Sequence, residues 1–123
     1  MNPASVLAAL DRALAGNGET VTLRRLTGDI AFDVECRAIV RGEVPDEARG
    51  DQVQDDSRVI ISASEIIAAQ WPGPRPESSD TRDWRVPVRD DQIRIAGRWR
   101  YIEEAMPIYL RGELVRITLK VRG

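Results

Sequence analysis

The side chains most available for chemistry are carboxylates, and they occur as adjacent doublets. Neighbouring residues on a strand point to opposite faces of a sheet, so such a doublet makes a poor acid–base pair or metal clamp. The acidic stretch 46–56 also lacks the ligand spacing and closing glutamate of a calcium loop. We therefore interpret the doublets as solvated loop charges and predict no metal site. They are Asp46-Glu47, Asp55-Asp56, Asp90-Asp91 and Glu103-Glu104.

The sequence contains few residues suited to nucleophilic catalysis. The chain has no histidine and one cysteine, which excludes an imidazole base, Cys/His zinc sites and an intrachain disulfide. Cys36 lies in the apolar phase of a strand alternation, which predicts a buried core residue. Ser62 and Ser64 would need the single lysine, Lys120, as a base. No glycine-rich phosphate loop is present, so we expect no enzymatic activity and no cofactor.

Arginine dominates the basic residues: all but one of the 18 are arginines. Arginine forms bidentate pairs with carboxylates and phosphates and stacks on aromatic rings, although a GC-rich genome would also explain the bias. Arg94, Arg98 and Arg100 lie close in sequence to Trp99 and Tyr101, the mixture that single-strand binders use. A solvated strand face with aromatic residues in the core is the favoured interpretation, because Glu103, Glu104 and Glu113 are interleaved with the basic residues. The net charge of −2 argues against a generally basic surface.

Hydrophobic periodicity predicts the elements of the first half of the chain. Asn2 is a suitable N-cap for an amphipathic helix over 3–15. The period then changes to two, which predicts a strand over 20–24 and a longer one over 30–41. Because a turn at 27–29 joins them, we expect an antiparallel hairpin.

The second half is expected to be rich in strands. A short central strand is predicted over 58–62, followed by a brief helix that Ser64 caps and that runs to Trp71. Pro107 is predicted to break the chain. The last strand is predicted over 114–122, with alternate apolar residues on one face.

The turn near Gly97 has two alternative registers. A two-residue turn would place arginines opposite Ile93 and Ile95, on the apolar face. We therefore predict a three-residue loop over 96–98, which pairs Ile95 with Trp99 and Ile93 with Tyr101.

Two stretches are predicted to be long mobile loops: 42–57, which is polar and acidic, and 72–88, which is rich in proline near its start. The chain is expected to form a single domain over 1–123. Its expected fold class is α+β: a small twisted antiparallel β-sheet or partly open β-barrel with an N-terminal helix, a short second helix and the two loops. No apolar run approaches the ~20 residues of a membrane-spanning helix, and residues 1–13 carry no secretory signal pattern.

The layout from the central strand onward resembles a known family. Strand 58–62 leads into Ala63-Ser64-Glu65-Ile66, then a proline-rich loop, then Asp91 to Ile102 around Gly97, and a final strand ending at Gly123. This order is similar to that of the small head–tail joining proteins of tailed bacteriophages, prophages and gene transfer agents, also called head completion, stopper or connector proteins. The resemblance covers roughly residues 58–123.

The resemblance implies a non-enzymatic virion protein. Copies would be monomers in isolation and would assemble in the bacterial cytoplasm, without a membrane, into a ring at the phage neck that extends the DNA channel. Its partners would be portal or connector proteins and tail proteins, with DNA at most a channel contact. The loops would supply the assembly interface, since Trp and Arg dominate protein hot spots. The interface residues expected are Trp71, Arg75, Arg82, Trp84, Asp46, Glu47, Asp55 and Asp56, with Arg94, Arg98 and Arg100 as ring or channel contacts.

Two other functions remain open. One is a small nucleic-acid-binding β domain of the OB kind that uses the arginines and aromatic residues of 93–101. The other is a tail-terminator or tail-tube protein of the same particle.

Overall fold

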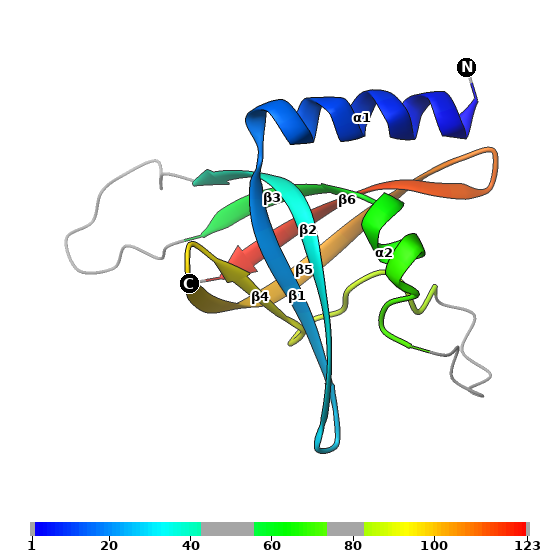
Figure 1. Cartoon of the computed structure of the whole chain (residues 1–123). Coiled ribbons are helices and arrows are strands. Elements are labelled where there is room, and N and C mark those ends of the chain that lie inside the picture. Colours follow the sequence, from blue (N-terminus) through cyan, green and yellow to red (C-terminus); the bar gives the residue numbers. More distant parts are fainter. Residues whose placement is uncertain (1, 43–55, 74–82, 123) are drawn as a thin grey trace.

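The computed structural model describes residues 2–42, 56–73 and 83–122, which form an antiparallel β-barrel with two helices. The strands close in the order β1-β2-β3-β6-β5-β4 (Figure 1). The predicted α+β class is confirmed, with a barrel that is closed rather than partly open. The helices are α1 (Pro3–Asn17) and α2 (Ser64–Ala69), and the strands are β1 (Glu19–Thr27), β2 (Ile30–Gly42), β3 (Ser57–Ser62), β4 (Gln92–Ile95), β5 (Arg98–Leu110) and β6 (Glu113–Arg122).

The hydrophobic core fills the barrel. Alternate residues of each strand point inward, and on β6 Ile117, Leu119 and Val121 are completely buried, as the alternation in the last strand predicts. Cys36 is 1% exposed, which confirms it as a core residue. Burial raises the pKa of its thiol to about 12, so it stays protonated at neutral pH.

Helix α1 forms as predicted and packs against β2, β3 and β6. Asn2 Oδ1 accepts a hydrogen bond from Ser5 N at 2.8 Å, which satisfies one of the free amides of the first turn. The helix also contacts α2, because Ser64 Oγ donates to Asp11 Oδ2 at 2.7 Å. Ser64 is therefore not the cap of α2. The N-cap position is Ala63, without a side-chain cap bond.

Strands β1 and β2 pair with each other over a longer stretch than either pairs with its other neighbour in the barrel. Strand β3 pairs with β2 only over 38–42, and β4 pairs with β1 only over 22–24. The distal end of the hairpin therefore extends away from the barrel (Figure 1). Its apolar residues Leu26 and Ile30 are 57% and 59% exposed. Alternation alone predicts burial for Ile30 as for Cys36, but no neighbouring strand covers it.

The β4–β5 turn differs from the predicted loop over 96–98. Ile95 pairs directly with Arg98, so Ala96 and Gly97 alone form the turn. Their φ angles are +51° and +80°. Two successive positive φ values are characteristic of the two-residue turn whose twist matches that of the flanking strands. The turn geometry, rather than the apolar pattern, therefore determines the register.

The observed register places one arginine inside the barrel. Arg100 lies opposite Ile93 and is 8% exposed. It is accommodated because its Nη1 donates to Ser57 Oγ at 2.9 Å. Trp99 pairs with Arg94 instead of Ile95 and faces outward.

Pro107 does not break the chain: β5 runs through it, and Pro107 pairs with Ile117 of β6. Strand β4 covers β5 only over 98–101. Within the described part of the chain, no strand pairs with the other edge of β5 at Pro107. A proline there removes no ladder hydrogen bond, because its nitrogen lies on the uncovered edge.

Candidate docking pocket beside helix α2

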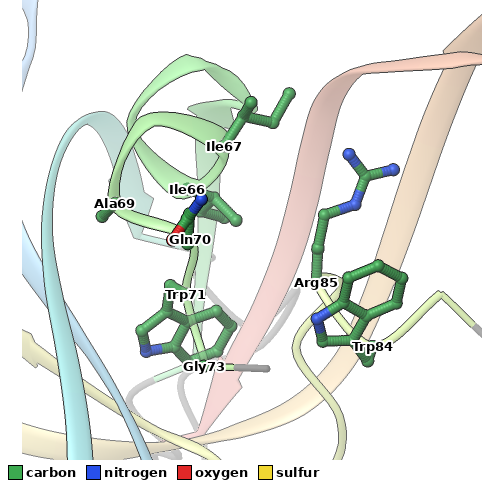
Figure 2. A pocket seen from close by; sticks show the side chains of 8 residues that line it. All are labelled: Ile66, Ile67, Ala69, Gln70, Trp71, Gly73, Trp84 and Arg85. Carbon is green, nitrogen blue, oxygen red and sulfur yellow. The ribbon is translucent and has the colours of Figure 1, made fainter. Parts of the chain in front are cut away.

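A pocket of about 580 Å³ lies between α2 and the segment that precedes β4. Figure 2 shows Trp71 and Gly73 below the helix on one side, and Trp84 and Arg85 on the other. The described residues that line it include no carboxylate, cysteine or serine. The lining is Ile66, Ile67, Ala69, Gln70, Trp71, Gly73, Trp84 and Arg85.

The first wall depends on how α2 ends. Gln70 adopts a left-handed conformation (φ +52°), and Trp71 N donates to Ile66 O at 3.1 Å. This sharp end turns Trp71 toward the barrel, where it is 2% exposed. Its indole Nε1 donates to Phe32 O at 2.8 Å. Trp71 is therefore a rigid wall of the pocket, whereas Ile67 is 42% exposed at its opening.

The second wall is held by Arg25 of β1. Arg25 Nη1 donates to Trp84 O at 2.9 Å and Nη2 donates to Val86 O at 3.2 Å. The same guanidinium pairs with Asp91 at 2.8 Å and lies 5.0 Å from the centre of the Trp71 ring. Arg25 thus connects both walls of the pocket and fixes their separation.

A polar cluster forms beside the second wall. Asp83 Oδ2 lies 2.9 Å from Arg85 Nη2 and accepts a hydrogen bond from Tyr109 Oη at 3.0 Å. Hydrogen bonds lower the pKa of the Asp83 carboxyl despite its partial burial. Those from Arg85 lower it more than the one from Tyr109. Arg85 also lies 5.7 Å from the centre of the Trp84 ring. The pocket is consequently apolar with a cation at its edge.

This arrangement is suited to binding rather than catalysis. The half-buried Trp84 and the exposed Ile67 offer apolar area to a side chain from another protein, against the buried Trp71 behind them. A guanidinium at the rim can pair with an acidic group beside that side chain. The described ranges contain no cluster of three metal-ligating side chains, and none of the described helices is long and apolar enough to span a membrane.

The structure brings together two of the residues predicted for assembly, Trp71 and Trp84. Asp56 lies elsewhere, ahead of β3, with one buried carboxylate oxygen that has no hydrogen-bond partner. The arginines predicted as ring or channel contacts lie on β4 and β5, away from the pocket, and face in different directions: Arg94 and Arg98 are exposed and Arg100 is buried. The remaining candidates, Asp46, Glu47, Asp55, Arg75 and Arg82, lie outside the described residues.

Sequence reasoning identified Trp84 in the second wall but missed the residues that hold this wall in place. Asp91 was interpreted as solvated loop charge, but it is 6% exposed and paired with Arg25. Arg85 and Tyr109 were not singled out for this role. No local pattern indicates the Arg25–Asp91 or Tyr109–Asp83 contacts, because their members lie far apart in the chain and meet only when the barrel closes. Asp83 and Arg85 are two residues apart, and that spacing was the local signal available.

No protein-family model matches this chain, and no curated protein matches it. The likeness to head–tail joining proteins therefore rests on the sequence features alone, and the function it implies is a proposal.

Proposed function

We propose that this protein is a non-enzymatic structural subunit of a tailed phage, prophage or gene transfer agent particle. Copies of it would form a ring between the portal and the tail and extend the DNA channel. The observation that supports the proposal best is the pocket between Trp71 and Trp84, which offers an apolar docking site on a small rigid barrel. A segment of a neighbouring virion protein is the proposed occupant.

The construction of the pocket supports a docking role. Interface hot spots are enriched in tryptophan and arginine and lie in well-packed pockets. Here the position of Trp84 is fixed by the Arg25 hydrogen bonds, and Trp71 is fixed by its bond to Phe32. Walls that are already ordered lose little conformational entropy when a partner binds.

Co-expression with the portal and tail proteins encoded beside its gene tests this proposal. We expect a purified monomer alone, a complex with at least one of these neighbours, and rings visible by electron microscopy. Trp84→Ala should weaken the complex by about thirtyfold, the effect of losing a hot-spot residue worth ~2 kcal/mol. Met106→Ala, which truncates an exposed apolar residue on β5, is the matched control and should leave the affinity unchanged. Failure to bind any neighbouring virion protein would overturn the proposal.

Two alternatives remain. A tail-terminator or tail-tube protein would use the same pocket, and the identity of the bound neighbour separates it from a joining protein. A nucleic-acid-binding domain would instead use the arginines and aromatic residues of 93–101. An OB-fold barrel has five strands whereas this barrel has six, so support for nucleic-acid binding must come from that surface rather than from the fold.

A further inference from the structure

The free end of the β1–β2 hairpin holds two apolar side chains in water. We call residues 26–30 the hairpin tip, and its two-residue turn is Gly28-Asp29. Gly28 has φ +60°, and glycine at the first position of such a turn is typical of the hairpin turns that match strand twist. Leu26 and Ile30 are the most exposed large hydrophobic residues in the described part of the chain. The tip is therefore an ordered projection with apolar side chains.

The tip is apolar on both of its faces. Consecutive register pairs of a hairpin point to opposite faces. Leu26 belongs to the pair with Ala31, and Ile30 belongs to the next pair, with Thr27. One large apolar side chain therefore lies on each face, and Asp29, the only charged residue of the tip, lies at the turn between them. This shape suits a cleft with two apolar walls better than a flat surface.

The pocket beside α2 is a cleft of this kind. Ile67 is exposed on the α2 side, and Trp84 is half-buried on the other side, next to Arg85 (Figure 2). Asp83 accepts hydrogen bonds from Arg85 Nε and Nη2. A guanidinium carries more N–H donors than these, so Arg85 can also pair with the carboxylate of Asp29. Tip and pocket thus match in apolar character and in charge.

The tip of the same copy cannot fill this pocket. Arg25 and Phe32, which hold Trp84 and Trp71, belong to the hairpin itself and are register partners. The tip begins one register pair beyond them and continues away from the barrel (Figure 1). To fold back, it would have to break the pairs that hold the pocket walls. A tip that enters the pocket must therefore come from another copy of the chain.

We propose that the hairpin tip of one copy docks in the pocket of the next copy. This assignment rests on the proposed function and names the adjacent ring subunit as the occupant of the pocket. Because tip and pocket are different surfaces, the contact repeats head to tail, and such contacts close into rings when the rotation between copies allows it. The tip is much smaller than the roughly 20–30 residues a side of a stable interface. Free copies are therefore expected to be monomers that associate when a portal brings several of them together.

Crosslinking of engineered cysteines at high protein concentration tests the contact. Thr27→Cys places a thiol on the tip and Gln70→Cys places one in the pocket lining, and both positions are exposed. A short bifunctional maleimide should join the double variant into dimers, trimers and larger species. An equimolar mixture of the two single variants should stop at dimers. Neither single variant alone should crosslink, and nor should the parent, because Cys36 is 1% exposed.

Removing the apolar side chains of the tip should abolish this ladder of crosslinked species. In the double-cysteine protein, Leu26→Ser/Ile30→Ser should lower the yield about tenfold or more, as expected when hot-spot residues are lost. Met106→Ser/Ile108→Ser removes two exposed apolar side chains from β5 and is the matched control, which should leave the ladder unchanged. Circular dichroism checks that both proteins keep the fold.

The outcomes separate this inference from the proposed function. Dimers of the Thr27→Cys variant alone would show that tips meet one another, and would overturn the assignment, as would equal losses in the tip and control variants. Absence of the ladder, with Trp84→Ala still weakening the complex with a portal or tail protein, would make that protein the occupant and leave the proposed function standing. A ladder without binding to any such neighbour would support the contact and overturn the proposed function.

Discussion

Arg25 and Asp91 form an ion pair of 2.8 Å although 66 residues separate them in the chain. Their side chains are 18% and 7% exposed. Asp91 Oδ2 also accepts a hydrogen bond from Val88 N at 2.9 Å. The pair therefore fastens the segment before β4 onto β1 and holds the second wall of the pocket in place.

Removing one partner of this pair should be strongly destabilising. Arg25→Ala leaves the Asp91 carboxylate buried without its counter-charge, and we expect the free energy of unfolding to fall by about 3 kcal/mol. Urea denaturation followed by circular dichroism measures this. Arg24→Ala is the matched control: it breaks the Arg24–Asp33 pair, whose side chains are 30% and 39% exposed, and water screens such pairs. Losses of equal size in the two variants would contradict the structural role of Arg25.

The Asp83 carboxyl should make stability depend on pH in the acidic range. Hydrogen bonds from Arg85 come first among the causes that lower its pKa below the ordinary 3.8. A carboxyl whose folded pKa is depressed contributes stability above its unfolded pKa, and that contribution is lost as pH falls through the folded pKa. Arg85→Ala should raise the pKa of Asp83, measured by NMR titration, more than Tyr109→Phe does. The reverse order would show that Tyr109 is the stronger partner.

Cys36 should be chemically inert in the folded protein. Burial raises the pKa of its thiol to about 12, and the thiolate is the reactive species. Incubation with iodoacetamide at about pH 8, near the ordinary thiol pKa, should leave the folded chain unmodified by mass spectrometry. The same treatment in denaturant should alkylate it completely. Rapid modification without denaturant would mean that the barrel opens readily around β2.

Gly97→Ala should destabilise the protein through backbone conformation alone. Gly97 has φ +80°, and a Cβ there would meet no atom within 4 Å, so the cost is that of a side chain at positive φ, about 1 kcal/mol. Gly16→Ala is the control, because Gly16 lies in α1 and a Cβ there also meets nothing within 4 Å. That change should stabilise the chain by about 0.5–1 kcal/mol. Thermal unfolding measures both, and equal effects would contradict the two-residue turn.

The sequence by itself determined the elements whose signals are local. The cap at Asn2 and the helical spacing after it predict α1, and strict alternation predicts the hairpin of β1 and β2 and the burial of Cys36. Each of these depends on residues a few positions apart, where capping and side-chain periodicity act directly.

Tertiary structure alone decided the register at Gly97, the inward position of Arg100 and the composition of the docking pocket. Arg100 is accommodated inside with its Nη1 donating a hydrogen bond to Ser57 Oγ, from a residue 43 positions away in the chain. Long-range pairing depends on how the whole barrel closes, and no short stretch of residues carries that information.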